Sequence, residues 1–139
     1  IVKLIALRST CKRLQLGALL VSADYQRVYA LGYNGGVRGL SNNSCDPSKP
    51  GACGCLHAEV NCLVKCQVDD PAKILFLTHN PCENCSKLIV NSGVSAVYFL
   101  EEYRSSTGLD ILRQAYIPTY QLIAGLDNEG WERLTPILR

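Results

Sequence analysis

The 139-residue sequence has no Met, one Trp and only two His residues. Because it begins at Ile1 without a Met, we expect that the natural N-terminus is not represented. It also lacks any apolar run near the roughly 20 residues that cross a bilayer. Residues 1–14 have the pattern of an amphipathic helix rather than a signal peptide. These absences predict a cytoplasmic protein without a membrane partner.

A large excess of one charge is missing as well. The 14 basic and 12 acidic residues give a net charge of +2 and are spread through the chain. Proteins that bind long nucleic acids usually carry a stripe of Lys and Arg. We therefore expect a small or locally anionic ligand and no long nucleic acid. With 47% apolar residues, the chain is long enough for one core, which predicts a single domain over 1–139.

Cysteine, in contrast, is abundant. Eight cysteines could form the disulfide framework of a secreted protein, but nothing else in the sequence is typical of secretion. Cys82 and Cys85 have the spacing of metal ligands. Cys62 and Cys66 lie four residues apart in an expected helix, where they are best interpreted as small buried apolar side chains. The eight positions are 11, 45, 53, 55, 62, 66, 82 and 85.

Hydrophobic periodicity predicts alternating strands and helices. Two strands with a short connection predict an antiparallel hairpin, and the later strand–helix alternation predicts parallel strands. Residues 34–55 form a Gly-, Pro-, Asn- and Ser-rich loop, which we interpret as functional because of its length. The fold class is thus α/β, a three-layer α/β/α sandwich with a mixed sheet of about five strands. Strands are expected at 15–22, 27–33, 73–78, 94–100 and 118–124, and helices at 1–14, 56–66, 82–93 and 108–116.

Three potential metal ligands lie at the starts of two expected helices. His57 opens one helix, and Cys82 and Cys85 lie in the first turn of the next, where backbone N–H groups favour thiolates. Three protein ligands with one open position define a catalytic zinc site. Glu59, two residues after His57, could move protons between a zinc-activated water and a substrate.

Each half of this pattern is weak alone, because Cys-x-x-Cys also occurs in structural zinc sites and redox motifs. Their order is more informative. His57-Ala58-Glu59 begins one helix, a strand follows, and Pro81-Cys82-x-x-Cys85 begins the next helix. This arrangement is the known signature of zinc-dependent nucleobase deaminases.

On these residues the sequence resembles the cytidine deaminase superfamily and, within it, the deoxycytidylate (dCMP) deaminase branch. The resemblance covers nearly the whole chain, including "GYNGGVRGL", "CLHAEVNCL", "THNPCENCSKLIVNSGV" and "GLDILRQA". It implies hydrolysis of dCMP to dUMP and ammonia, which supplies dUMP for thymidylate synthesis. It also implies a sheet of the cytidine deaminase type.

The resemblance also implies roles for individual residues. His57, Cys82 and Cys85 match the zinc ligands, and Glu59 matches the proton shuttle. Substrate contacts are expected from Asn34 at the sugar hydroxyl, the backbone of Ala58 at the base, and Arg38 or Arg104 at the phosphate. Asn34 could instead be a turn residue before two glycines, and either Arg could be a solvated surface charge.

Regulation is implied in the same way. Many members of the branch are homohexamers activated by dCTP and inhibited by dTTP, at a second site that uses a Gly-Tyr-Asn-Gly segment. Gly32, Tyr33, Asn34 and Gly35 match it, and Mg²⁺ could accompany the triphosphate. Some members carry a second, structural zinc, which Cys11, Cys45, Cys53 and Cys55 could hold here. Ordinary free thiols are the alternative.

Other functions remain open from the sequence. The same zinc chemistry could act on dCTP or on a base in single-stranded nucleic acid. A zinc-stabilised binding module without catalysis is a further alternative, although such a module would have no use for Glu59.

Overall fold

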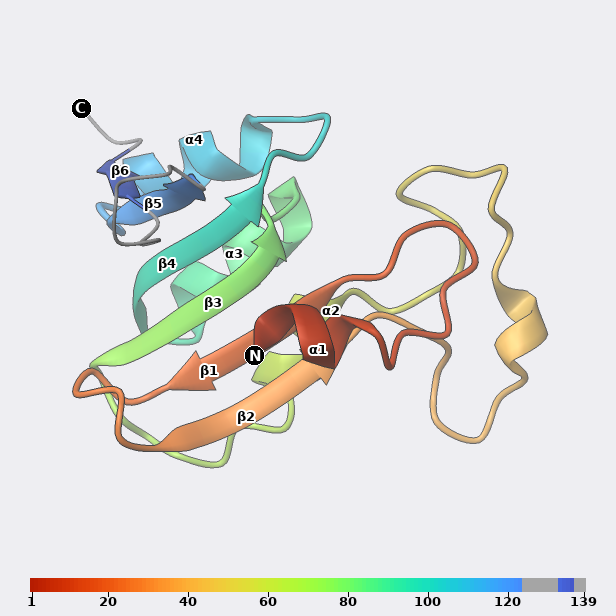
Figure 1. Cartoon of the computed structure of the whole chain (residues 1–139), viewed down its shortest axis with the longest axis horizontal. Helices are drawn as coiled ribbons and strands as arrows, with labels where there is room; N and C mark the ends of the chain where they lie inside the picture. Colours follow the sequence, from red (N-terminus) through yellow and green to blue (C-terminus); the bar gives the residue numbers. More distant parts are fainter. Residues whose placement is uncertain (124–132, 137–139) are drawn as a thin grey trace.

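A computed structural model of the chain describes residues 1–123 and 133–136. Six strands form one sheet in the order β2-β1-β3-β4-β5-β6. β1 (Gly17–Val21) pairs antiparallel with both β2 (Val28–Tyr33) and β3 (Lys73–His79), whereas β3, β4 (Val94–Glu101) and β5 (Thr119–Ile123) run parallel. The predicted hairpin and the parallel run that follows it are confirmed (Figure 1).

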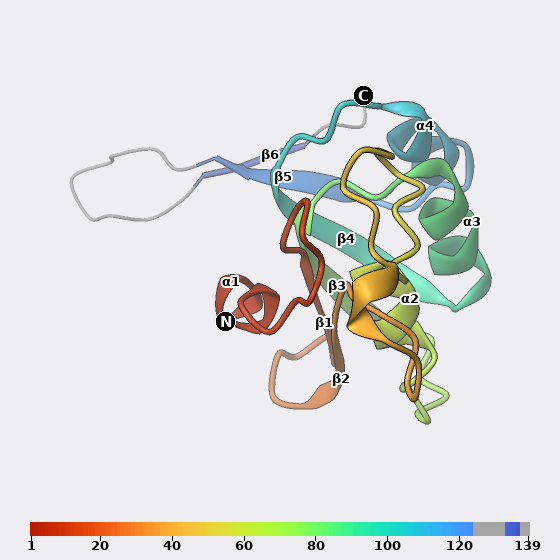
Figure 2. The same cartoon turned by 90° about the vertical axis from the view of Figure 1, so that its right-hand side faces the viewer.

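Helices cover the two faces of the sheet unequally. α1 (Val2–Ala6) lies on one face, and α2 (Ala58–Leu63), α3 (Glu83–Asn91) and α4 (Thr107–Gln114) lie on the other (Figure 2). The main core lies between the sheet and these three helices, and its largest fully buried side chains include Phe99, Leu20, Leu75 and Ile89. The predicted three-layer α/β/α sandwich with a mixed sheet is therefore confirmed.

The predicted helix over residues 1–14 is wrong beyond Ala6. Residues 9–16 follow an irregular path because their backbone is bonded to the end of β2. The amide of Asn34 accepts a hydrogen bond from Leu16 N–H at 2.7 Å and donates to the carbonyl of Leu14 at 2.7 Å. The Ser9 hydroxyl donates to the carbonyl of Asn34 at 2.8 Å. These tertiary bonds replace the local bonds that a helix would make.

The C-terminal segment also differs from the prediction. Arg133–Pro136 form β6, a strand antiparallel to β5 that the sequence pattern did not predict. The weak periodicity of residues 125–139 predicts a tail that packs on the domain or on a neighbouring subunit, and apart from β6 these residues lie outside the described part of the chain.

The long segment between β2 and α2 is irregular, as predicted, apart from a single 3₁₀ turn at Asn42–Ser44. A two-way backbone pair between Gly35 and Leu56 closes its base. The segment lies next to residues 7–16, beyond the carboxyl end of β2 (Figure 1). Within residues 1–123 and 133–136, no helix is long and apolar enough to cross a membrane.

Candidate metal centre and active site

The starts of α2 and α3 bring the three predicted zinc ligands together. His57 is the residue that caps α2 and Cys82 the residue that caps α3, both in extended conformation, with Cys85 one turn into α3. Pro81 precedes Cys82 and lies outside the helix, where its missing N–H removes no hydrogen bond of α3. Both helices cover the same face of the sheet, so their N-termini meet near the carboxyl end of β3 (Figure 2).

The distances among the three ligand atoms fit one zinc ion. Nδ1 of His57 lies 3.5 Å from Sγ of Cys82 and 3.4 Å from Sγ of Cys85. With Zn–N near 2.05 Å and Zn–S near 2.3 Å, a tetrahedral ion separates nitrogen and sulfur by about 3.5 Å. The three atoms, which all lie within 4.8 Å of one another, can therefore ligate one ion and leave a fourth position open.

The charge of the cluster also favours a cation. Hydrogen bonds from Cys85 and His57 lower the pKa of the Cys82 thiol to about 3, which favours its thiolate form. The neighbouring Cys82 and burial raise the pKa of Cys85, because two thiolates repel each other at this distance. A divalent cation between them removes that repulsion and stabilises both as thiolates.

Glu59 lies in the first turn of α2 and is only 6% exposed. Burial raises the pKa of its carboxyl group. Its Oε2 has no hydrogen-bond partner among the described residues. Because buried polar atoms are nearly always paired, this oxygen is available to a water molecule or a substrate. Glu59 also lines the cavity beside the cluster, as a proton-transfer group must.

A narrow cavity adjoins the cluster, and Asn34, Ala58 and His79 lie in its wall with His57, Glu59 and Cys82. Ala58 is 1% exposed and leaves room beside the metal ligands. Asn34 is buried and uses both ends of its amide to hold residues 14–16. Asn80 donates to the carbonyl of Ser105 at 2.9 Å and accepts from Tyr103 N–H, which fixes the loop after β4 at the cavity.

The three arginines near this region occupy different places. Arg38 is exposed and is not among the residues that line the cavity. Arg104 lines a wider depression on the outer side of His57 and Cys82, with its guanidinium carbon 5.1 Å from the centroid of the Tyr103 ring. Arg13, which sequence analysis did not select, lies in the cavity wall and donates to the Tyr103 hydroxyl at 3.0 Å.

The predicted effector segment packs directly against α2. A Cβ atom on Gly32 would lie 2.4 Å from the carbonyl oxygen of Ala58 and 2.5 Å from the N of Cys62. Asn61, also in α2, donates from its side chain to the carbonyl of Tyr33 at 2.9 Å. Residues 32–35 are therefore physically connected to the helix that carries Glu59.

Known proteins with similar sequences and structures identify the family of the chain. Residues 1–101 match the family described as "Cytidine and deoxycytidylate deaminase zinc-binding region". ComE operon protein 2 of Bacillus subtilis is 35% identical over 108 residues, covering 73% of this chain and 56% of that protein. The deoxycytidylate deaminase of Mycobacterium phage D29 is 35% identical over 112 residues, covering 70% of this chain and 86% of that protein.

The dCMP deaminase of cyanophage S-TIM5, solved in complex with dCMP and dUMP, superposes with a TM-score of 0.78 at 36% identity. The match covers 87% of this chain and 90% of that one. The fold, the order of the ligands in the sequence and the relatives all point to one class of protein, the zinc-dependent deaminases, which are hydrolases. More narrowly, the chain belongs to the family of cytidine and deoxycytidylate deaminases.

Proposed function

We propose that this protein hydrolyses dCMP to dUMP and ammonia, and so supplies dUMP for thymidylate synthesis. The observation that carries the proposal is the buried, unpaired Oε2 of Glu59 in the same cavity as the His57–Cys82–Cys85 cluster. Similarity to phage deoxycytidylate deaminases over most of their length supports the choice of substrate.

Glu59 performs the proton transfers in this mechanism. His57, Cys82 and Cys85 would hold the zinc ion, which would supply a water of lowered pKa as the nucleophile near neutral pH. The Glu59 carboxylate accepts a proton from the attacking water and delivers it to N3 of cytosine as the oxygen bonds to C4. It then carries the second proton to the amino group, the C4–N4 bond breaks, and ammonia leaves as the C4 carbonyl forms.

Two wall residues orient the nucleoside in this proposal. Asn34 contacts the sugar hydroxyl through the hydrogen-bonding capacity that its backbone bonds leave, since an amide offers two donor protons and two acceptor lone pairs. The backbone of Ala58 lies against the base. Burial of both residues beside the cluster supports these roles.

The phosphate is assigned to Arg13, with Arg104 at the outer opening as a second contact. A guanidinium has five donor protons and suits the fork-shaped geometry of phosphate. The bond to Tyr103 occupies one of these and orients the group in the cavity wall. Arg38, which is exposed, is better interpreted as a solvated charge.

Arg13→Ala is expected to raise KM for dCMP about 10- to 100-fold, the loss of a charged hydrogen bond, with a smaller change in kcat. Deoxycytidine, which has no phosphate, should be turned over equally well by the variant and the parent. Steady-state kinetics on both substrates measure the difference. Arg38→Ala is the matched control and should behave as the parent protein. Equal losses on dCMP and deoxycytidine would assign Arg13 a merely structural role.

The proposed substrate is tested by ammonia release from zinc-loaded protein with dCMP, dCTP, deoxycytidine and a cytosine-containing oligonucleotide. Selective turnover of dCMP is expected. Preference for dCTP or for the oligonucleotide would retain the zinc chemistry but reject the substrate. If no cytosine compound reacts, a zinc-stabilised binding module becomes the better explanation.

The same assay tests regulation. We infer a homohexamer that dCTP, with Mg²⁺ on its triphosphate, activates and dTTP inhibits through residues 32–35. Contact between this segment and α2 supports the inference, as do large exposed apolar side chains on α1 and β2, such as Leu4 and Val28. Saturation by dCMP should be sigmoidal and become hyperbolic with dCTP. A hyperbolic curve that neither nucleotide changes would exclude this regulation.

A cytoplasmic location stays a prediction.

A further inference from the structure

His79 is a residue of the cavity wall that the proton-transfer mechanism does not use. It is the last residue of β3 and lines the same cavity as the catalytic cluster. Its Nδ1 is buried and has no hydrogen-bond partner among the described residues. Two other buried side-chain atoms of the described part share this property, Oε2 of Glu59 and Oγ of Ser86, but Ser86 does not line the cavity. Because buried polar atoms are nearly always paired, Nδ1 of His79 marks a second position in the cavity that a ligand can satisfy.

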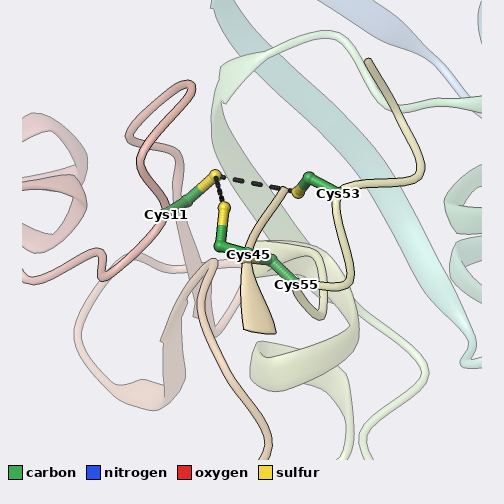
Figure 3. Close-up of side chains that lie close together, drawn as sticks. All are labelled: Cys11, Cys45, Cys53 and Cys55. Atoms are coloured by element: carbon green, nitrogen blue, oxygen red, sulfur yellow. Dashed lines mark hydrogen bonds between the residues drawn. The ribbon is translucent and has the colours of Figure 1, made fainter. Parts of the chain in front are cut away.

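Neighbouring polar side chains of the cavity wall have partners of their own. Arg13 donates to the Tyr103 hydroxyl at 3.0 Å, and Asn80 donates to the carbonyl of Ser105 at 2.9 Å. The wall also contains thiols that belong to a cluster of four, in which the sulfur atoms all lie within 4.8 Å of one another. This is the arrangement that the resemblance implied for a second metal ion. Figure 3 shows how the side chains of this cluster converge, from Cys11, Cys45, Cys53 and Cys55.

The two ring nitrogens of His79 have different surroundings. Nε2 lies 3.5 Å from Oε2 of Glu101, the residue opposite His79 on β4. A carboxylate beside Nε2 favours the tautomer that carries its proton on this nitrogen. Burial lowers the pKa of His79, against the opposing effect of Glu101, and so favours the neutral ring. In this form Nδ1 presents a lone pair and is a hydrogen-bond acceptor.

The strand register places His79 across from Asn34. β1 pairs with β2 on one side and with β3 on the other, and both registers, continued to the ends of the strands, put Leu16 between these two residues. Two strand spacings then separate the Cα atoms of Asn34 and His79 by about 10 Å. The amide of Asn34 reaches into this gap, since it bonds to the backbone of Leu16 and Leu14. A small ligand group over Leu16 therefore meets an amide on one side and an imidazole on the other.

Both side chains point to the face of the sheet that α2 covers. Side chains two residues apart in a strand lie on the same face. Leu77, two residues before His79, belongs to the core on the α2 side. Gly32, two residues before Asn34, lies directly against the backbone of α2. His79 and Asn34 therefore face the helix that carries Glu59, where the substrate must lie.

We propose that His79 is a specificity-determining residue whose Nδ1 accepts a hydrogen bond from the 3′-hydroxyl of the substrate sugar. This inference rests on the proposed function and adds a second partner for the hydroxyl. A hydroxyl is both a donor and an acceptor. Asn34 gives one amide proton to the carbonyl of Leu14 and has the other for the hydroxyl oxygen, but its Oδ1 already accepts from Leu16 N–H. His79 supplies the acceptor for the hydroxyl proton.

Loss of this acceptor should affect only a substrate that has the hydroxyl. In His79→Phe, KM for dCMP should rise about 10- to 100-fold, the cost of leaving one partner of a buried hydrogen bond unpaired. Its kcat should change little, because the bond is present before and during the reaction. The compound 2′,3′-dideoxycytidine 5′-monophosphate lacks the hydroxyl, so it should react poorly with the parent and equally poorly with the variant. His79→Asn is the matched control, because its Oδ1 can replace Nδ1 as the acceptor, and it should keep most of the preference for dCMP.

Steady-state kinetics on the two nucleotides separate the possible outcomes. Equal losses on both in His79→Phe would overturn the proposal and give His79 a structural role. A parent protein that does not distinguish the two nucleotides would overturn it as well. In either case dCMP turnover by the parent leaves the proposed function standing. A parent that does not turn over dCMP would reject the proposed function, and the role of His79 with it.

Nuclear magnetic resonance on the parent protein decides the question if His79→Phe does not fold. The chain has only two His residues, so the ring-nitrogen signals of a ¹⁵N-labelled sample can be separated. The product dUMP also carries the 3′-hydroxyl. We expect the unprotonated Nδ1 of His79 to shift when dUMP binds, but not when 2′,3′-dideoxyuridine 5′-monophosphate binds. A proton on Nδ1, or the same shift with both nucleotides, would overturn the proposal.

Discussion

Replacing Glu59 with Gln is expected to lower kcat about 10³-fold, within the range of general acid–base catalysis, while zinc stays bound. Gln has nearly the same shape but cannot accept the proton of the attacking water. Glu59 is the only carboxylate among the described residues that line the cavity, so no neighbouring acid is placed to take over this task. The measurement combines steady-state turnover of dCMP, zinc content by mass spectrometry and a thermal melt.

A matched control separates loss of this carboxylate from a general effect of charge. Glu83 lies in the first turn of α3, as Glu59 lies in that of α2, but it is exposed and forms a 2.9 Å ion pair with Lys87. Glu83→Gln should therefore retain parental kcat and lose less than about 0.5 kcal/mol of stability. An active Glu59→Gln variant would refute the proton-transfer role, and a variant that loses its zinc would leave Glu59 a structural group.

The parts of the fold that sequence analysis predicted are those with strong local signals. The fully apolar run at 73–78 and the turn at Gly93, which has a φ of +71°, correspond to β3 and the end of α3. The helix predicted over residues 1–14 ends at Ala6, because the side chain of Asn34 accepts a hydrogen bond from the backbone of Leu16. These two residues are 18 positions apart in the sequence. Periodicity carries no information about such distant partners.

The residues of the candidate site also divide into those that the sequence could predict and those that it could not. The ligands His57, Cys82 and Cys85 were recognisable because helix starts place their side chains in a definite direction, and the structure brings all three together. Arg13 was missed because its segment was assigned to a helix, and only the irregular path of residues 9–16 carries it to the cavity. Arg38 was selected because it lies in the glycine-rich loop, but that loop leaves it exposed. The positions of residues at helix starts were therefore predictable, whereas the positions of loop residues depend on contacts that form only in the folded chain.

Gly32→Ala is expected to destabilise the protein by about 3 kcal/mol, the upper part of the range for overpacking. The new methyl group would meet the carbonyl oxygen of Ala58 at 2.4 Å and the N of Cys62 at 2.5 Å, both backbone atoms of α2 that cannot rotate away. β2 and α2 must then separate, which displaces the helix that carries Glu59. Denaturant unfolding should report the loss, together with a fall of about 10 °C in Tm.

Gly39→Ala provides the comparison, because a Cβ at Gly39 meets nothing within 4 Å, although its φ of +80° is unfavourable for Ala. Its cost should be only about 1 kcal/mol. The pair also separates two explanations for Gly32, which lies in the predicted effector segment. If close packing is the reason for glycine there, Gly32→Ala loses stability and dCMP turnover together, in the absence of any nucleotide effector. Parental stability combined with a lost response to dCTP would instead assign Gly32 to effector binding, and would mean that β2 and α2 can move apart at little cost.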